Sequence, residues 1–272
     1  MNLVERLARG VRHAPLLRNV APLWGSVRPT YDALLEVLWG RTGLERRVNE
    51  LPIQISPRHR NVPEEYEPAT WRAALDQVRP GDAIVEVGAH IGLYTIAFAR
   101  RVGPAGTVMA FEPEPANLAA LRLHLRMNAV EDRVVAVGAA VSDRPGLIGF
   151  ASGRGSESRI ARGHDRSVTV PAVTLDAALE GRRVDGLKVD VEGAELLVLR
   201  GARALLADPS RRPRWLLVEV HPFAWEAFET TSDLLVAELA RHGYDARGLD
   251  DRIVERITGY GWVLARRSGF SG

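Results

Sequence analysis

The chain of 272 residues contains no cysteine. This excludes disulfide bonds, cysteine-ligated zinc and thiol catalysis. A large excess of one charge sign is also missing, because 36 Lys and Arg residues are offset by 34 Asp and Glu residues, for a formal net charge of +2. That surplus is too small to indicate nucleic acid or an anionic membrane as a partner. Because no apolar run reaches the ~18 residues of a membrane span and the N-terminus lacks a signal-peptide core, we expect a cytoplasmic protein.

The composition, 46% hydrophobic and 26% charged, is that of a globular protein with a sizeable core. We divide the chain into an N-terminal helical extension with a linker, residues 1–68, and a main domain, residues 69–272. In the extension, "MNLVERLARGVRHAPLL" and "YDALLEVLWG" have the spacing of amphipathic helices. The prolines of "ISPRHRNVPEEYEP" favour an extended linker. The extension either caps the main domain, joins the subunits of a homo-oligomer, or touches a membrane.

From Thr70 onward, apolar strands alternate with helices. This alternation is typical of a mainly parallel sheet that helices cover on both faces. The sequence therefore predicts an α/β fold with a Rossmann-like sheet, in which a closing pair of strands, 244–250 and 261–267, contains one antiparallel strand. The other predicted strands are 83–87, 107–111, 134–138, 186–191 and 215–220, and the predicted helices are 70–78, 91–102, 115–128, 194–206 and 231–241.

A loop with two glycines, "GAHIG", follows the first strand of the main domain. A dinucleotide-binding loop needs a middle glycine, which lets the backbone approach a pyrophosphate and is missing here. A phosphate-binding P-loop is excluded because no Gly-Lys-Ser/Thr follows. Glu86, two residues before Gly88, would repel a pyrophosphate but attract a sulfonium or an ammonium group. The loop therefore favours S-adenosylmethionine, which carries both cations.

An acidic residue, Glu112, ends the second strand in "VMAFEPEP". At this position a carboxylate can accept hydrogen bonds from both ribose hydroxyls of an adenosine cofactor. A dinucleotide ribose is bound in the same way, and an acid near the N-terminus of the next helix is favourable by itself. Glu112 alone therefore does not identify the cofactor, but with Glu86, Gly88 and Gly92 it favours S-adenosylmethionine.

Five blocks of the main domain resemble FkbM-type methyltransferases: "VEVGAHIGLYTIAFA", "AFEPEPANLAALRLHLRMN", "VTLDAAL", "LKVDVEGAELLVLRGA" and "LLVEVHP". The resemblance covers roughly residues 64–265. It implies a class I methyltransferase fold, S-adenosylmethionine as donor, and O-methylation of a small molecule such as a macrolide, sugar or glycolipid. His90 departs from the family, which usually has Asn there. We expect the cofactor to contact Glu86, Gly88, His90, Gly92, Tyr94, Glu112, Pro113, Ala140 and Asp190.

Polar residues end two neighbouring strands of the predicted sheet. Lys188, Asp190 and Glu192 alternate along one strand and so project from one face. Glu219 and His221 end the next strand, and ligands of α/β sheets bind at such carboxyl ends. We expect His221, Asp190 and Glu192 to be catalytic. His221 titrates near neutrality and can remove the proton of an acceptor hydroxyl, while Glu219 or Glu192 orients its ring.

Simpler roles for these residues stay open. Asp190 could cap a helix, Glu195 could be a first-turn acid, and His221 could bind backbone. A divalent cation on Asp190, Glu192, Glu219 and His221 is a further alternative, because some O-methyltransferases orient a diol with magnesium. The spacing fixes no ligand geometry, and we therefore assign no metal.

A long connection, residues 151–167, is rich in Gly, Ser and Arg and lies between the predicted strands "LIGF" and "VTVPAV". Its length predicts a lid over the acceptor, although its composition also suits a plain surface loop. The arginines that could bind a phosphate or carboxylate of the acceptor are Arg154, Arg159, Arg162 and Arg166.

Other classes of function share this fold. A methyltransferase acting on base nitrogens usually has an Asn-Pro-Pro-Tyr-like motif after the fourth strand, where "DVEG" stands here. No stripe of aromatic and basic residues is present either, so we expect no nucleic-acid partner. A dehydrogenase would need the missing glycine. A further alternative is a non-catalytic module that binds S-adenosylmethionine but lacks a catalytic base. An activity assay distinguishes such a module from an enzyme.

Overall fold

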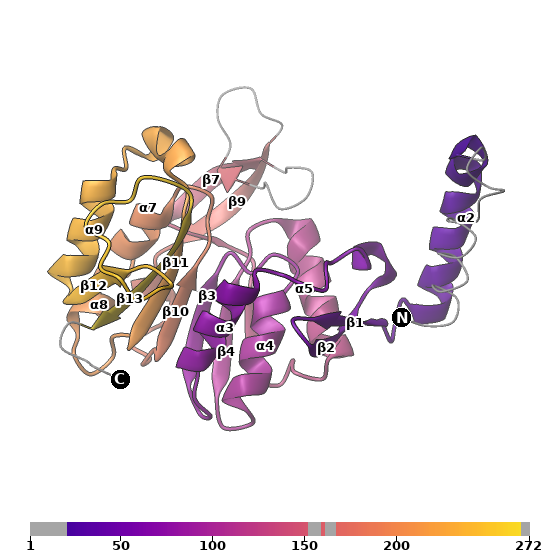
Figure 1. Ribbon diagram of the computed structural model, residues 1–272, viewed down its shortest axis with the longest axis horizontal. Coiled ribbons are helices and arrows are strands. Elements are labelled where there is room, and N and C mark those ends of the chain that lie inside the picture. Colours follow the sequence, from indigo (N-terminus) through magenta and orange to yellow (C-terminus); the bar gives the residue numbers. More distant parts are fainter. Residues whose placement is uncertain (1–20, 152–158, 161–166, 268–272) are drawn as a thin grey trace.

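The computed structural model describes residues 21–151, 159–160 and 167–267. A seven-stranded sheet forms its centre, in the order β12-β13-β11-β10-β3-β4-β5 (Figure 1). β13 is antiparallel to β11 and β12, and the remaining pairs are parallel. This confirms the predicted Rossmann-like class I methyltransferase sheet with one antiparallel strand. The strands are β3 (Ala83–Val87), β4 (Thr107–Phe111), β5 (Val134–Val137), β10 (Gly186–Val189), β11 (Trp215–Val220), β12 (Tyr244–Arg247) and β13 (Gly261–Arg267).

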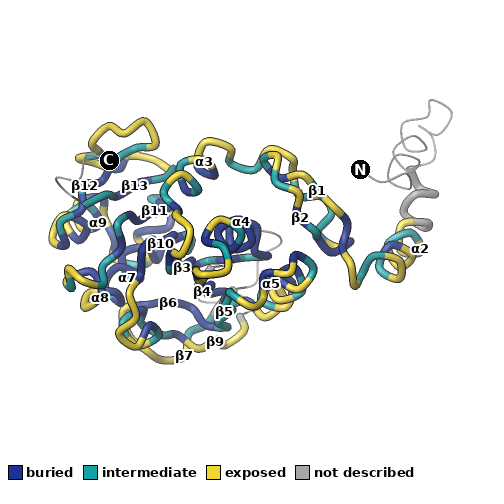
Figure 2. The backbone as a smooth tube through the Cα atoms, turned by 90° about the horizontal axis from the view of Figure 1, so that it is seen from below, coloured by how far each residue is buried: buried dark blue, intermediate teal, exposed yellow. Residues whose placement is uncertain are grey.

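The central strands are apolar on both faces because helices cover both. All residues of β10 and β11 are buried, as in parallel sheets between two helical layers. The predicted strands 83–87, 107–111 and 215–220 coincide with β3, β4 and β11. Figure 2 shows these strands as the buried centre of the molecule.

Two helical layers sandwich the sheet. On one face, α4 joins Leu217 and Leu264 of the sheet in one core, and on the other α7 joins Leu187 and Val218 in a second. The predicted helix 194–206 is in fact two, α7 and α8, which are separated at Gly201 and Ala202. A Cβ at Gly201 would lie 2.0 Å from the carbonyl oxygen of Ser142. The helices are α3 (Pro68–Gln77), α4 (Leu93–Val102), α5 (Pro115–Met127), α6 (Leu175–Ala178), α7 (Glu195–Arg200), α8 (Arg203–Ala207) and α9 (Ser232–Arg241), with a short 3-10 helix η3 (Pro222–Phe228) after β11.

The N-terminal extension contains helix α2 (Ala21–Trp39), which includes most of the predicted helix "YDALLEVLWG". α2 stands away from the sheet (Figure 1). It contacts the short 3-10 helix η2 (Pro57–His59), and Arg60 Nη2 lies 2.5 Å from Asp32 Oδ1. The first predicted helix lies outside the described residues. No helix of the described part is both long and apolar enough to cross a membrane.

A β-hairpin, which the sequence did not predict, follows α2. Its strands are β1 (Leu44–Val48) and β2 (Leu51–Ile55). The turn between them has positive φ at Asn49 and at Glu50, whereas hairpin turns of this kind usually carry Asn-Gly. Asn128 of the segment after α5 fixes β2, since its side chain accepts from Gln54 N–H at 3.0 Å and donates to Gln54 C=O at 2.8 Å.

A second sheet, in the order β6-β9-β7-β8, lies between β5 and β10 in the chain. Its strands are β6 (Ala140–Val141), β7 (Gly146–Ala151), β8 (Arg159–Ile160) and β9 (Ser167–Val173). β7 and β9 pair antiparallel, which confirms the two strands predicted around the arginine-rich connection. The predicted lid with Arg154, Arg162 and Arg166 lies outside the described residues, and of Arg159 only the backbone is described.

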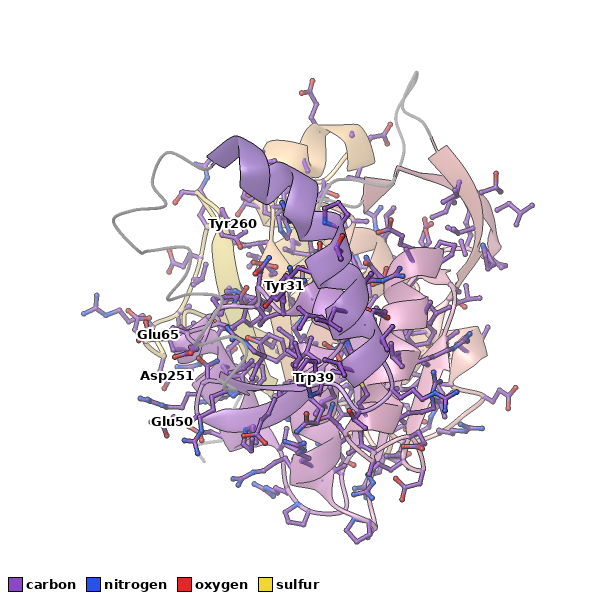
Figure 3. All side chains as sticks on the ribbon, turned by 90° about the vertical axis from the view of Figure 1, so that its right-hand side faces the viewer. Tyr31, Trp39, Glu50, Glu65, Asp251 and Tyr260 are labelled. Atoms are coloured by element: carbon purple, nitrogen blue, oxygen red, sulfur yellow. The ribbon has the colours of Figure 1, made fainter. Side chains whose placement is uncertain are left out.

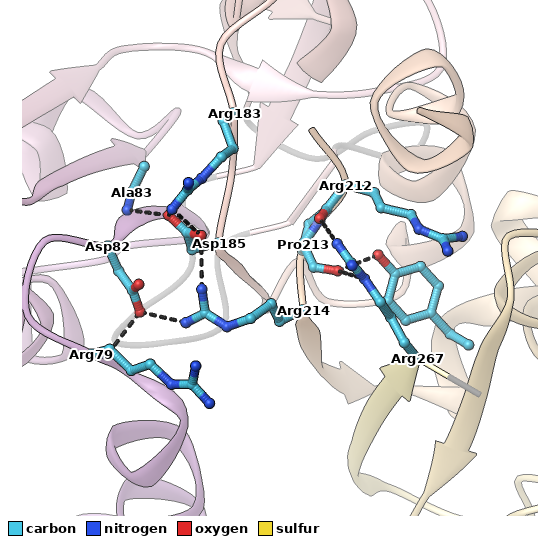
Figure 4. A network of polar contacts seen from close by, with 10 residues as sticks. Arg79, Asp82, Ala83, Arg183, Asp185, Arg212, Pro213, Arg214 and Arg267 are labelled. Atoms are coloured by element: carbon cyan, nitrogen blue, oxygen red, sulfur yellow. Dashed lines mark hydrogen bonds and ion pairs between the residues drawn. The ribbon is translucent and has the colours of Figure 1, made fainter. Parts of the chain in front are cut away.

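An ionic network ties together the starts of three central strands, at the opposite edge from the strands' carboxyl ends (Figure 4). Arg214 contacts Asp82 and Asp185 at 2.7 Å each. Asp185 also accepts from Arg183 and from the N–H of Ala83. Burial would raise the pKa of Asp185, but these hydrogen bonds lower it below its ordinary value. The network therefore aligns β3, β10 and β11 before their carboxyl ends.

Arg214→Ala should lower the free energy of unfolding by about 3 kcal/mol, because it leaves the buried carboxylate of Asp82 without its counter-charge and leaves Asp185 paired with Arg183 alone. Urea unfolding measures this loss. The control is Arg252→Ala, which breaks a pair with Asp250 on the surface (3.5 Å) and should cost at most about 1 kcal/mol. Equal losses in the two variants would contradict a special contribution from the network.

Candidate functional site

A pocket of about 690 Å³ opens at the carboxyl ends of β3, β4, β10 and β11, where ligands bind in α/β sheets. The predicted site residues that line it are Gly88, His90, Glu112, Asp190, Glu192 and His221. An adjoining pocket of about 60 Å³ is lined by Gly88, Glu112 and Asp190 as well, and also by Pro113 and Ala140. The structure thus brings most of the predicted residues together around one continuous site.

The loop between β3 and α4 requires glycine at both ends. φ is 87° at Gly88 and 93° at Gly92, in the region that favours glycine. A Cβ at Gly88 would lie 1.8 Å from the carbonyl oxygen of Asp190, so this glycine also lets β3 and β10 end side by side. Gly92 lines neither pocket. Its role is to allow the backbone turn with which the loop ends.

Glu112 holds the same loop from the end of β4. Its Oε2 accepts from the N–H of His90 at 2.7 Å, and its Oε1 accepts from the N–H of Glu114 at 3.0 Å. Burial raises the pKa of Glu112, although these two donors lower it. Asn117 Nδ2 also lies 3.5 Å from Oε1. Because Oε2 has a second lone pair, the carboxylate can still accept a hydrogen bond from a ligand.

Glu86 and Tyr94, two of the predicted cofactor contacts, lie behind the pocket wall and line neither pocket. The Glu86 carboxylate is fully buried and accepts from Thr95 Oγ1 at 2.6 Å. Burial raises the pKa of Glu86 to about 7, against the lowering effect of Lys188 and Thr95. The Tyr94 hydroxyl donates to Glu67 Oε2 at 3.2 Å. Both residues therefore act on the pocket through their neighbours.

Lys188, the only lysine of the chain, lies buried under the pocket. Its Nζ is 3.1 Å from Asp190 Oδ2 and 3.8 Å from Glu86 Oε1. The rings of Tyr94 and Trp262 lie over it, with centroids at 4.7 and 5.3 Å. Burial lowers the pKa of Lys188, but Asp190 and Glu86 outweigh this and raise it. The lysine is therefore charged and keeps the pKa of Asp190 below its ordinary value.

His221 is held in one orientation by a buried carboxylate. Its Nδ1 is 2.8 Å from Glu195 Oε1, and Glu195 also accepts from Trp225 Nε1 and from the N–H of Gly193, each at 2.8 Å. Since a carboxylate only accepts, Nδ1 carries the proton and Nε2 is the free base. Glu192 Oε2 lies 3.4 Å from Nε2.

The partner of His221 Nδ1 is thus Glu195, and not Glu219 or Glu192 as the sequence predicted. Glu195 does begin α7, as a first-turn acid would, but its side chain turns toward the end of β11, 26 residues away. Burial lowers the pKa of His221, but the hydrogen bond to Glu195 and the charge of Glu192 raise it above its ordinary value.

Tyr260, which the sequence did not single out, completes the wall beside His221. Its hydroxyl donates to Glu219 Oε1, and its ring centroid lies 5.3 Å from that of His221. Burial and the nearby charge of Asp190 raise the pKa of Glu219 to about 9. Glu219 therefore holds a proton more readily than an ordinary glutamate, and its side chain is hydrogen-bonded to Asp190. No pattern marks Tyr260, which ends the loop before β13.

Asp190, Glu192 and His221 could also hold a metal ion, because one ligand atom of each lies within 4.8 Å of the others. The ammonium of Lys188, however, already neutralises Asp190. The acidic residues that line the larger pocket are Glu67, Glu112, Asp190, Glu192 and Glu219, and no arginine or lysine of the described chain does so. Such a wall fits a cofactor that carries a sulfonium and an ammonium group and disfavours a pyrophosphate.

The chain is similar in sequence to known proteins. The family model described as "Methyltransferase FkbM domain" matches residues 86–246. The 31-O-demethyl-FK506 methyltransferase FkbM of Streptomyces tacrolimicus is 27% identical over 206 residues, which cover 69% of this chain and 75% of that protein. The AMB antimetabolite synthetase AmbE of Pseudomonas aeruginosa is 28% identical over 236 residues, 70% of this chain but only 11% of AmbE.

Solved structures with a similar backbone include a S-adenosylmethionine-dependent O-methyltransferase from Thermotoga maritima (TM-score 0.44, 14% identity, 79% of this chain and 70% of that chain). Another is Aeropyrum pernix fibrillarin with bound S-adenosylmethionine (TM-score 0.42, 17% identity, 72% of this chain and 76% of that chain). The family model matches more than half of the chain. The protein therefore belongs to the FkbM-domain family of S-adenosylmethionine-dependent methyltransferases.

Proposed function

We propose that the protein transfers the methyl group of S-adenosylmethionine to a hydroxyl of a small molecule, such as a sugar, a glycolipid or a polyketide. The orientation of His221 supports this proposal. Its Nδ1 is bound to the buried carboxylate of Glu195, and its Nε2 lies beside Glu192 in the wall of the pocket. The name of the relative from Streptomyces tacrolimicus, which describes an O-methyltransferase, agrees with it. Incubation of hydroxylated compounds with protein and S-adenosylmethionine should yield S-adenosylhomocysteine and a methyl ether, as mass spectrometry can detect.

The cofactor would lie across the ends of β4, β3 and β10. Pro113 and Ala140 of the smaller pocket suit the adenine, and Glu112 suits the ribose hydroxyls. The Gly88 loop would run beside the methionine part, with Asp190 near the sulfonium. When bound, the cofactor supplies a methyl group activated by the positive charge on its sulfur.

In the proposed reaction His221 is the general base. Its Nε2 accepts the proton of the acceptor hydroxyl while the new carbon–oxygen bond forms, and Glu195 stabilises the resulting imidazolium. Glu192 and Asp190 orient the acceptor by accepting hydrogen bonds from its hydroxyls, and such positioning supplies much of the rate. The acidic wall also disfavours the phosphate backbone of a nucleic acid.

His221→Ala should lower turnover by ~10²-fold or more and leave the affinity for S-adenosylhomocysteine nearly unchanged, because the proton loses its acceptor. His221→Asn keeps a similar size but cannot act as a base, and it should be about as slow. Single-turnover rates at saturating cofactor measure both. If Asn restores most of the rate, His221 only positions the acceptor, and the base is Glu192 or Asp190.

Turnover should rise with pH along an acid limb set by His221, because only the neutral imidazole accepts a proton. The carboxylates raise the pKa of His221 above 6.5, so the limb should lie above that pH. Glu192→Gln removes a negative charge 3.4 Å from Nε2. This lowers the pKa of His221, and the limb should move to lower pH in rates measured from about pH 5 to 9. A limb that stays in place would point to another titrating group.

Activity should survive removal of divalent cations, because the charge of Asp190 is already neutralised by Lys188 at 3.1 Å. The test compares initial rates after dialysis against EDTA with rates after addition of Mg²⁺ or Mn²⁺. Loss of activity with EDTA and recovery with Mg²⁺ would instead assign Asp190, Glu192 and His221 as metal ligands.

A further inference from the structure

Glu67, an acidic residue of the pocket wall, has no role in the proposed reaction. Glu67 lines the pocket from the turn before α3, outside the residues 86–246 that match the FkbM domain. Its φ is 43°, a left-handed conformation that residues other than glycine rarely adopt. His90 and Glu192, which also line the pocket, share this feature. Such strained residues cluster at ligand sites, where the surrounding structure holds them.

The β1–β2 hairpin holds the segment that carries Glu67. Asn49 of the hairpin turn accepts from the N–H of Tyr66 at 3.1 Å and donates to the carbonyl of Tyr66 at 2.5 Å. The carbonyl of Glu67 then accepts from the N–H of Trp71 and starts α3. Because the backbone is fixed on both sides of Glu67, its carboxylate has a defined place in the pocket wall.

The surroundings of the carboxylate place it over β3 and β10. Oε2 accepts from the hydroxyl of Tyr94, in the first turn of α4. Lys188 and Asp190 of the β10 end are near enough to affect its pKa, which burial raises. Glu112, the proposed ribose partner, ends β4, and β3 lies between β4 and β10 in the sheet. Glu67 therefore stands across the pocket from the ribose end, on the side of the methionine part.

The other acids of this pocket already have partners. Glu112 holds two backbone N–H groups, Asp190 contacts Lys188, and Glu192 and Glu219 flank His221. Glu67 Oε2 has a neutral donor, Tyr94, and Oε1 accepts no hydrogen bond from the described residues. The cofactor carries two cations, of which the sulfonium lies near Asp190 in the proposed orientation. Its second cation, the α-ammonium group, still requires a carboxylate.

We propose that Glu67 binds the α-ammonium group of S-adenosylmethionine, an inference that rests on the cofactor orientation given under the proposed function. A carboxylate and an ammonium form a charge-assisted hydrogen bond, which is stronger than a bond between neutral groups. Recognition of the methionine end thus depends on a residue outside the matched domain, held in place by the β1–β2 hairpin.

The test is Glu67→Gln, which removes the charge and keeps the shape, with binding measured by calorimetry. S-adenosylhomocysteine should bind about 10-fold more weakly than to the wild type, the loss expected for a hydrogen bond to a charged group. 5′-Methylthioadenosine lacks the amino-acid part, and its affinity should not change. The analogue of S-adenosylhomocysteine without the amino group should also bind wild type and variant alike.

Two controls separate local from general effects. Glu65→Gln alters an exposed glutamate of the same segment, labelled in Figure 3, and should change neither affinity. Glu112→Ala should weaken S-adenosylhomocysteine and 5′-methylthioadenosine together, by ~10-fold or more, because both contain the ribose. The inference is wrong if Glu67→Gln leaves S-adenosylhomocysteine binding intact, or weakens both ligands equally. If the wild-type protein binds neither ligand, the proposed cofactor site itself is wrong.

Discussion

The ion pair between Lys188 and Asp190 is the interaction on which the site depends. Each buried charge costs several kcal/mol of desolvation unless another charge meets it at close range. Lys188 meets two, Asp190 at 3.1 Å and Glu86 at 3.8 Å, so the three side chains fix one another at the centre of the sheet. Lys188 thereby lowers the pKa of Asp190 at the pocket wall, and the charge of Asp190, together with burial, raises the pKa of Glu219 beside it. A lysine that never reaches the pocket thus sets the charge of the surface that a ligand meets.

The backbone places the Asp190 carboxylate at the pocket wall, where the ends of β3 and β10 approach each other closely. β3 and β10 end side by side only because Gly88 has no Cβ where the carbonyl of Asp190 approaches. Beyond the strand ends, His90 and Glu192 adopt positive φ, which turns both residues into the pocket wall. The ionic network of Arg214 fixes the other ends of the same strands. The strands therefore fix the positions of the site residues, and the strained turns at His90 and Glu192 orient these residues toward the pocket.

The sequence predicted the strands and site residues that are marked by a pattern of neighbouring residues. Continuous apolar runs marked β3, β4 and β11, and acids at strand ends marked Glu112 and Asp190, because the carboxyl ends of parallel strands meet at one edge. It did not predict contacts set by tertiary packing. Glu195 looked like an ordinary first-turn acid, and nothing in its neighbours reveals the ring 26 residues away that it holds. The β1–β2 hairpin was missed because Glu50 stands where a glycine is usual, and the placement of Glu67 was missed with it.

The acidic wall also has a consequence for the proposed reaction as a whole. Before transfer, the positive charge facing these carboxylates is on the sulfur of the cofactor, and His221 is neutral. After transfer, the sulfur is neutral, and the proton taken from the acceptor makes His221 positive. Glu195 and Glu192, at 2.8 and 3.4 Å from the two ring nitrogens, then stabilise the charge that the cofactor has lost. The net charge inside the pocket is the same on both sides of the transition state. A wall of fixed carboxylates therefore faces the same net charge before and after transfer and does not have to reorganise, which is the condition under which preorganised electrostatics is most effective.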